Sequence, residues 1–238
     1  MKRYSFILCA IFFLTCFSVS AAQELVRVKC NNITMNVPSA NVRCFQIDGN
    51  IPLAAEPSQA DLANAQIAGT YVYFSDYENI KTEIEPQVNL YLIDDMTRTS
   101  FGFLDIAIKL QDDLTNLSAG YGNIADISKE SSFMPVQAKE RTFAAFPEIL
   151  TFQEGSGLRT VVSFTDSILA SGNESNLYYS FQGISKDGRY YISAVFPLMS
   201  LSLNNMNAAD IDWSKIDGSD FQPSLAQLDY YIRSIVIE

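Results

Sequence analysis

The sequence contains no histidine among its 238 residues, and this absence excludes several classes of active site. Catalytic triads and dyads that use an imidazole as the general base cannot form. Most zinc, copper and non-haem iron sites are disfavoured as well, because they depend on imidazole ligands. The sequence also lacks the G-x-G-x-x-G pattern and the Walker A motif that hold phosphates. We therefore expect no bound cofactor.

Basic residues are scarce. Lys and Arg number 16 against 27 Asp and Glu, and two of the basic residues, Lys2 and Arg3, lie at the start of the chain. The residues after position 22 therefore carry 14 basic and 27 acidic side chains, a net charge of −13. Nucleic-acid-binding proteins need clustered Lys and Arg to neutralise phosphates, and the sequence shows no such cluster after position 22. We predict an acidic protein that does not bind nucleic acid.

Residues 1–22 have the features of a secretory signal peptide. Lys2 and Arg3 precede an apolar run over residues 6–17, and small residues close the segment. The run is shorter than the ~20 residues that span a membrane, so we predict cleavage, with an uncleaved anchor as the alternative. The mature chain is expected to begin near Gln23 and has no stretch of 18 apolar residues, so no membrane span is expected in it. These features predict export to the bacterial periplasm or the cell exterior.

Only four cysteines are present, and Cys9 and Cys16 belong to the predicted leader. In an oxidising compartment the remaining pair, Cys30 and Cys44, is expected to form a disulfide. It would close a loop of about 15 residues, worth about 3 kcal/mol in the chain-entropy model. Two thiolates without histidine do not complete a zinc shell. Lipidation of Cys16 is the alternative to free export, although the residue before it is not small.

Helical periodicity occurs twice in the mature chain. Ser100 or Thr99 can cap a long middle helix that ends at Gly120, and a shorter helix follows Pro223. Each helix carries one apolar stripe, made of Phe103, Ile106, Ala107, Leu110, Leu114 and Leu117 in the first and Leu225, Leu228, Ile232 and Ile235 in the second.

Alternating apolar residues predict strands and hairpins elsewhere. The expected strands cover residues 26–29, 33–37, 71–74, 88–93, 149–154, 158–165, 177–185 and 190–198. Gly155-Ser156-Gly157 is predicted to form one turn, and Asp187-Gly188 is typical of a type I′ turn. The pattern indicates an α+β fold, with a mainly antiparallel sheet packed against the middle and C-terminal helices. We expect one domain over residues 23–238, with a long surface loop over residues 51–70 that contains one helical turn from Gln59 to Ala65.

The turn at Asp187-Gly188 sets the register of the last hairpin and separates two faces. One face is apolar throughout, with Tyr179 opposite Phe196. The other face is mixed, and we expect it to be accessible to water. Its tyrosines could stack on a sugar or peptide, unless a second layer covers them as core. The candidate ligand-binding residues are Tyr178, Gln182, Tyr191 and Ser193, together with the single tryptophan, Trp213.

Carboxylates are the remaining catalytic candidates. A histidine-free hydrolase would need at least two of them in one cleft, drawn from Asp94, Asp95, Asp210, Asp212 and Asp217. The last three could also supply oxygen ligands to calcium, but their spacing does not match an EF-hand loop. Helix capping by Asp220 or Ser219 and ordinary solvation are the favoured interpretation of this acidic segment.

Three segments resemble a family of uncharacterised exported bacterial proteins. The first is the last hairpin, with Tyr178-Tyr179-Ser180-Phe181-Gln182-Gly183-Ile184 and the strand that follows its turn. The second is residues 152–159, which are similar to the family's F-x-N-G-S-G-x-R turn, and the third is residues 221–235. The chain departs from that pattern at Glu154. The resemblance implies export and a fold but no reaction, and a looser similarity in element order is to PsbP-like α+β domains. We expect a non-enzymatic binding or envelope-associated module for a protein, peptide or glycan, with the carboxylate hydrolase as the alternative.

Overall fold

The structure is a computed structural model that describes residues 25–38, 41–48, 58–75, 77, 80–137, 139–171 and 174–238. The predicted leader with Cys16, the predicted cleavage point and residues 51–57 of the predicted loop lie outside these ranges. No helix within them is long and apolar enough to cross a membrane.

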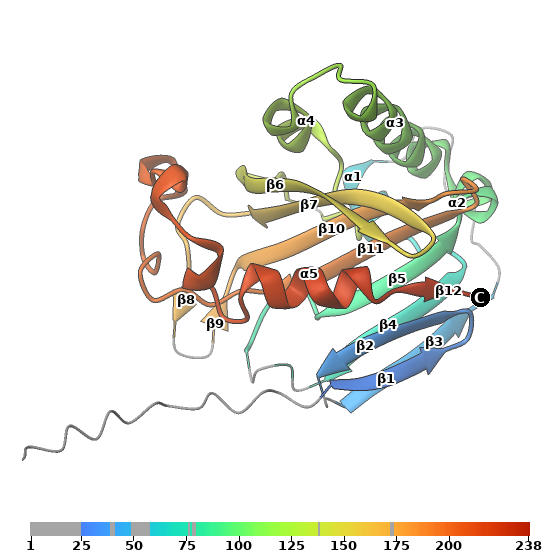
Figure 1. Cartoon of the computed structure of the whole chain (residues 1–238), viewed down its shortest axis with the longest axis horizontal. Coiled ribbons are helices and arrows are strands. Elements are labelled where there is room, and N and C mark those ends of the chain that lie inside the picture. The colour runs from blue at the N-terminus through green and yellow to red at the C-terminus, as the bar shows by residue number, and fades with distance from the viewer. Residues whose placement is uncertain are drawn as a thin grey trace, which may run out of the picture.

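A seven-stranded antiparallel sheet forms the centre of the fold (Figure 1). In spatial order its strands are β3 (Asn41–Ile47), β4 (Gly69–Ser75), β5 (Gln87–Leu92), β11 (Tyr190–Pro197), β10 (Leu177–Ser185), β7 (Gly155–Ser163) and β6 (Phe143–Phe152). Every pairing between neighbours is antiparallel. The α+β class and the antiparallel sheet predicted from the sequence are therefore confirmed.

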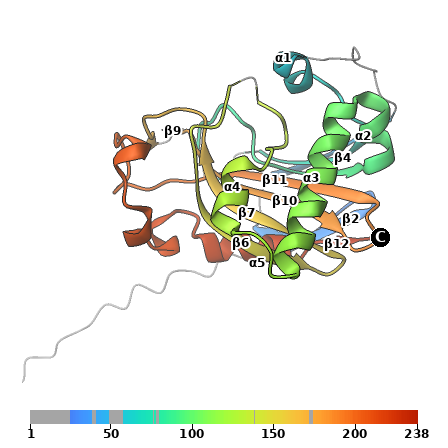
Figure 2. The same cartoon turned by 90° about the horizontal axis from the view of Figure 1, so that it is seen from above.

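Both faces of this sheet are covered. One face packs against α5 (Leu225–Arg233) and a three-stranded sheet of β1 (Leu25–Cys30), β2 (Ile33–Pro38) and β12 (Val236–Ile237). The other face lies under α2 (Ile93–Thr99), α3 (Phe101–Ser118) and α4 (Ile124–Glu130), with the short α1 (Gln59–Ala63) beside them (Figure 2). At one end lie β8 (Ala170–Ser171), β9 (Glu174–Ser175) and three 3₁₀ turns, η2 (Ala208–Asp210), η3 (Trp213–Lys215) and η4 (Gly218–Asp220).

The larger core lies between the central sheet and α5. The predicted register of the last hairpin is confirmed, with Phe181 opposite Ala194 and Tyr179 opposite Phe196. All four side chains are fully buried, together with Leu228 of α5. This confirms that the face assigned to the core from its apolar pattern is the one packed against the C-terminal helix.

The long middle helix forms as predicted. The Ser100 Oγ accepts a hydrogen bond from the Gly102 N–H at 3.1 Å and so caps α3, and Gly120 adopts a φ of 79° just beyond its end. The stripe residues Phe103 and Leu110 are buried. The sequence did not predict α2 and α4, because a seven-residue helix has too few turns to show a period.

One predicted turn is wrong. The chain reverses at Gln153 and Glu154, and Gly155 already pairs with Phe152 inside β7. A Cβ on Gly155 would lie 2.2 Å from the carbonyl oxygen of Ile184 on β10. Glycine is needed here for the close approach of two strands and not for the turn itself.

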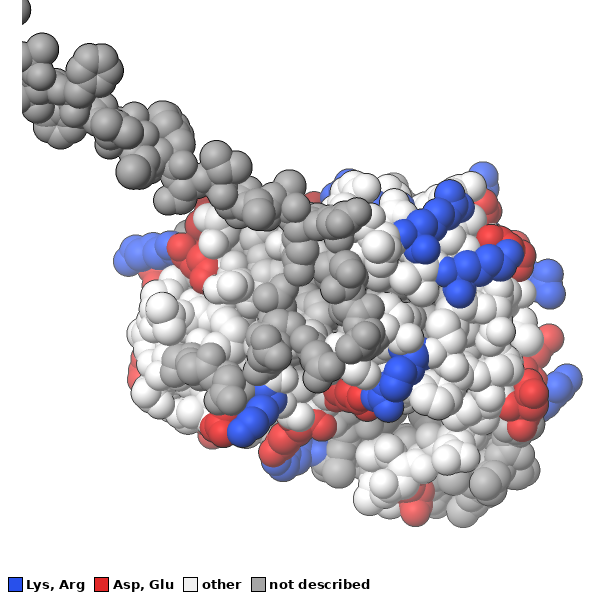
Figure 3. All heavy atoms as spheres, turned by 90° about the horizontal axis from the view of Figure 1, so that it is seen from below, with Lys and Arg blue, Asp and Glu red and all other residues white. Residues whose placement is uncertain are grey.

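The disulfide between Cys30 and Cys44 is present and joins β1 to β3, as predicted. On the face opposite α3 and α4, Lys and Arg side chains alternate with Asp and Glu among uncharged residues (Figure 3).

Candidate functional site

The predicted binding face of the last hairpin is buried. Tyr178, Gln182, Tyr191 and Ser193 share one face of the sheet, but their exposed fractions are only 2%, 4%, 0% and 0%. The expectation of a face accessible to water is therefore wrong, because the layer of α3 and the segment over residues 131–137 covers it. The alternative, in which these side chains are covered as core, is the one that the structure shows.

Hydrogen bonds tie this covering layer to the sheet. The Gln182 side-chain amide donates to the carbonyl of Met134 at 3.0 Å, and the Tyr191 hydroxyl donates to Gln182 Oε1 at 2.7 Å. Burial raises the pKa of Tyr191 far above its usual value. A ligand would have to displace the layer to reach these side chains, so their use as ligand contacts stays a prediction.

A row of buried polar side chains runs across the same face. It consists of Gln87, Asn89, Thr160, Ser180, Gln182 and Ser193. The amide of Asn89 donates to Gln87 Oε1 at 2.8 Å, and that of Gln182 donates to Ser180 Oγ at 3.1 Å. The Asn89 Oδ1 has no hydrogen-bond partner in the part of the chain that the structure describes. The row explains why polar and apolar residues alternate along these strands, as they do on a solvent-exposed face, although both faces are buried.

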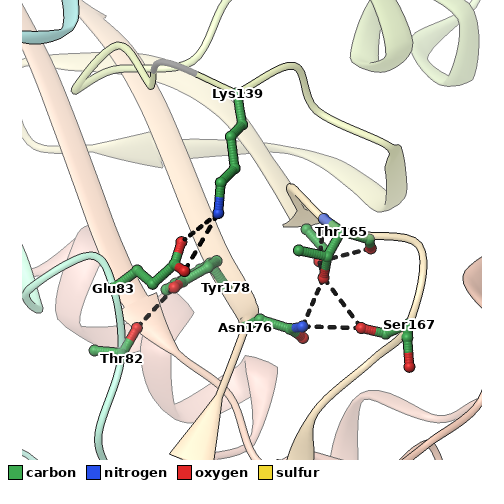
Figure 4. Close-up of polar contacts among 8 residues, drawn as sticks. Thr82, Glu83, Lys139, Thr165, Ser167, Asn176 and Tyr178 are labelled. Atoms are coloured by element: carbon green, nitrogen blue, oxygen red, sulfur yellow. Dashed lines mark hydrogen bonds and ion pairs between the residues drawn. The ribbon is translucent and has the colours of Figure 1, made fainter.

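Tyr178 lies at the edge of this face, next to the ion pair between Lys139 and Glu83 (Figure 4). Its hydroxyl accepts a hydrogen bond from Thr82 Oγ1 at 2.8 Å, and burial raises its pKa. Next to it, Lys139 Nζ lies 3.2 Å from the carboxylate of Glu83. The Tyr178 ring also packs against Phe164, with ring centroids 6.2 Å apart. Phe164 and Lys139 both line a cavity next to Tyr178, which is described below.

This cavity has a volume of about 720 Å³ and lies between α3, the end of α4 and residues 131–137 and 139–141. We call it the cationic cavity. Its basic lining residues are Lys109, Lys129, Lys139 and Arg141, and its apolar wall includes Leu62, Ile106, Phe133, Val136 and Phe164. Asp105, Glu130 and Glu140 also line it. Four of the 14 basic residues that follow position 22 thus meet at one cavity of an acidic protein.

Two of the four cations already have acidic partners. Lys109 lies 3.3 Å from Asp113, and Lys139 pairs with Glu83. For Lys129 and Arg141, no carboxylate of the described residues lies within ion-pair distance. They are therefore the two cations that an added anion could pair with.

Arg141 is half-buried in the cavity wall. Its guanidinium donates a hydrogen bond to the carbonyl of Lys129, and burial lowers its pKa below the usual value. A charge removed from water is stabilised by a counter-charge or by further hydrogen bonds. A ligand anion at this position would supply both.

Sequence reasoning missed this cluster. Lys109 comes from α3, Lys129 from α4, and Lys139 and Arg141 from the connection to β6. The statement that no basic cluster follows position 22 holds for the linear sequence and is wrong for the folded chain. The one available signal was the occurrence of three cations between residues 129 and 141 in a chain with few of them.

No family model, curated protein or solved structure matches this chain. The resemblance to exported bacterial proteins and to PsbP-like domains therefore stays a prediction.

The last ligand candidate, Trp213, lies apart from the hairpin face. It packs on the cluster between the sheet and α5, and its ring stacks on Phe143 with centroids 4.8 Å apart and 22° between the planes. Phe146 meets it edge-on. Trp213 is half-buried in this aromatic group and does not share a site with Tyr178.

The candidate carboxylates do not gather. Asp94 and Asp95 lie on α2, whereas the acidic segment of η2 to η4 lies at the opposite end of the molecule (Figures 1 and 2). Within that segment, Asp212 accepts a hydrogen bond from the Ser214 N–H and Asp217 accepts one from the Ser219 N–H. Hydrogen bonds from Ser214 and Ser219 lower the pKa values of these two carboxyl groups.

These oxygens cap 3₁₀ turns, with Asp212 at the N-cap of η3 and Asp217 at the N-cap of η4. Neither residue predicted as a cap takes that position, since Asp220 completes the capping box of η4 and Ser219 lies inside the turn. The described residues contain no group of three acidic or cysteine side chains suited to a metal ion. The arrangement of Asp210, Asp212 and Asp217 therefore gives no support to the calcium site.

Proposed function

We propose that residues 23–238 form one exported binding domain, and that the cationic cavity takes a small organic anion. The ligand would carry a carboxylate, sulfonate or phosphate group and an apolar part. The observation that carries this proposal is Arg141, a half-buried guanidinium in the cavity wall without a carboxylate partner among the described residues.

The chemistry of the wall favours this class of ligand. A guanidinium presents a planar set of donors that matches the two oxygens of a carboxylate, and Lys129 can add a point charge beside it. Ile106, Phe133 and Phe164 offer apolar surface to the remainder of the ligand. A volume of about 720 Å³ is that of a small-molecule site.

The same features favour binding over reaction. A hydrolase that uses carboxylates needs two of them on either side of a bond, but the candidates on α2 and on η2 to η4 lie at opposite ends of the molecule. The Cys30–Cys44 disulfide is compatible with the oxidising compartment that the leader predicts. We therefore keep the non-enzymatic interpretation.

The test is a fluorescence titration of the purified protein with anilinonaphthalene sulfonate, an organic anion with an apolar body. Arg141→Gln should weaken its binding about ten- to a hundredfold, because a hydrogen bond to a charged group contributes about 1.5–3 kcal/mol. The uncharged analogue phenylnaphthylamine should bind both proteins equally.

Lys215→Gln serves as the matched control. Lys215 is an exposed cation of η3 that pairs with Asp212 and does not line the cavity. If the sulfonate does not bind, or if its affinity is the same in the wild type and Arg141→Gln, the proposal is wrong. An equal loss in Arg141→Gln and Lys215→Gln would show a general charge effect and would also contradict it.

A further inference from the structure

A second pocket, of about 590 Å³, lies beneath the turn between β1 and β2. The ends of β3, β4 and β5 form its floor, and Tyr190 at the start of β11 forms part of its wall. Amide and hydroxyl side chains from three of these segments line it, namely Asn31, Asn32, Gln46 and Thr70. We call it the amide pocket.

These four side chains form one hydrogen-bonded group. The Asn31 amide donates to Gln46 Oε1 at 2.9 Å. The Thr70 hydroxyl lies 2.8 Å from Gln46 Oε1 and 2.9 Å from Asn32 Oδ1. A hydroxyl has one hydrogen, so Thr70 can donate to only one of these two oxygens at a time. The other oxygen remains able to accept a hydrogen bond from a ligand.

The group also keeps unused donors. Each side-chain amide carries two N–H groups. Within the described part of the chain, the NH₂ groups of Gln46 and Asn32 have no side-chain or backbone acceptor. The amide pocket therefore presents donors and acceptors side by side.

The fold holds this group in place from two directions. Cys30 directly precedes Asn31, and its disulfide partner Cys44 lies two residues before Gln46 on the same strand face. On the other side, the Glu238 N–H donates to the carbonyl of Asn32 at 2.9 Å. A pre-organised site loses less entropy when it binds a ligand.

Tyr190 supplies an aromatic surface to the same site. It is half-buried, and it lines both the amide pocket and a neighbouring pocket of about 490 Å³ next to Lys186 and Asp187. The guanidinium carbon of Arg189 lies 5.6 Å from its ring centroid. A ring with a polar tip suits a ligand that has both an apolar face and hydroxyl groups.

We infer that the amide pocket is a saccharide-binding site. Each sugar hydroxyl is both donor and acceptor, which matches the mixed capacity of Asn32, Gln46 and Thr70. The charged side chains are of mixed sign, with Arg98 paired to Asp95 at 2.9 Å, so the pocket does not select an anion. A peptide added to a sheet edge would use main-chain groups, whereas Asn32, Gln46 and Thr70 offer side-chain groups to this pocket.

The test uses maltotriose and chitotriose as probes, with trialanine as the peptide comparison. Saturation-transfer NMR should show binding of at least one trisaccharide to the wild-type protein. Gln46→Ala should weaken it about three- to tenfold, because one neutral hydrogen bond contributes about 0.5–1.5 kcal/mol. Gln46 is exposed on β3, so the substitution leaves the core intact.

Asn116→Ala is the matched control, because Asn116 is an exposed amide on α3 that does not line the amide pocket. It should bind the sugar as the wild type does. Arg141→Gln should also keep sugar binding, so failure of the anion proposal is distinguishable from failure of this one. The inference is overturned if neither trisaccharide binds, if Gln46→Ala binds it with unchanged affinity, or if trialanine binds at Gln46 instead.

Discussion

At the scale of single residues, Asp229 stands out as a buried acidic side chain among the residues that the structure describes. It is buried on α5, where its carboxylate accepts a hydrogen bond from the Tyr179 hydroxyl at 2.9 Å. The Arg159 Nε lies 3.9 Å from Asp229 Oδ1, and the Arg159 guanidinium also pairs with Glu148. Burial nevertheless raises the pKa of Asp229 above 3.8, because the loss of water outweighs the attraction of Arg159 and the hydrogen bond from Tyr179.

The raised pKa predicts a pH dependence of stability. The contribution of Asp229 favours the folded state fully below pH 3.8 and is lost as the pH rises through the raised pKa. Asp229→Asn cannot ionise and keeps an oxygen for Tyr179. The free energy of unfolding of the variant, measured by urea unfolding, should therefore increase relative to that of the wild type as the pH rises from 3 to 7. Asp112→Asn, at an exposed position, is the control and should show the same pH dependence of stability as the wild type. The assignment would be contradicted if Asp229→Asn became less stable relative to the wild type as the pH rises.

At the scale of elements, the spacing between β7 and β10 depends on glycine. Gly157 lies opposite Gly183, and a Cβ on Gly157 would lie 2.3 Å from the carbonyl oxygen of Gln182 and 2.6 Å from the Gly183 Cα. Backbone atoms of a central strand cannot give way without moving the sheet. Gly157→Ala should therefore destabilise the protein by at least about 1–3 kcal/mol in urea unfolding.

Gly102→Ala is the control for this prediction. Gly102 lies in the first turn of α3, and a Cβ there would be 3.5 Å from its nearest neighbours, an ordinary contact. Alanine in place of a helical glycine stabilises by roughly 0.5–1 kcal/mol. If Gly157→Ala also proved neutral or stabilising, the strands would not be as close as the structure shows.

The elements also show what the sequence can predict. The sequence predicts the middle helix because its apolar stripe repeats over several turns and a serine caps it. It predicts the last hairpin because Asp187-Gly188 determines the register. The sequence places a turn at Gly155-Ser156-Gly157 instead of at Gln153 and Glu154, because glycine is common both in turns and where strands approach closely. Local pattern cannot distinguish these two uses.

At the scale of the whole molecule, the site depends on contacts that no local pattern contains. The polar alternation of Ser180, Gln182 and Ser193 predicts a face accessible to water. Under α3, however, the Gln182 amide donates to Ser180 and to the carbonyl of Met134, and Ser193 accepts a hydrogen bond from Asn89. The cationic cavity and the amide pocket each draw residues from several separate elements. The sequence supplied the residue types, and only the fold showed which of them meet.

The Cys30–Cys44 disulfide is a covalent cross-link between the small sheet and the central sheet, in addition to the backbone that joins them. It closes a loop of about 15 residues, so in the chain-entropy model its removal should lower the free energy of unfolding by about 3 kcal/mol. At roughly 2–4 °C per kcal/mol for a chain of this size, the double variant Cys30→Ala/Cys44→Ala should melt roughly 6–12 °C below the wild type. A reductant should lower the wild-type melting temperature towards that value and leave the variant unchanged. A wild type insensitive to reductant, with a variant equally stable, would mean that the noncovalent contacts of β2 and β12 alone hold the small sheet.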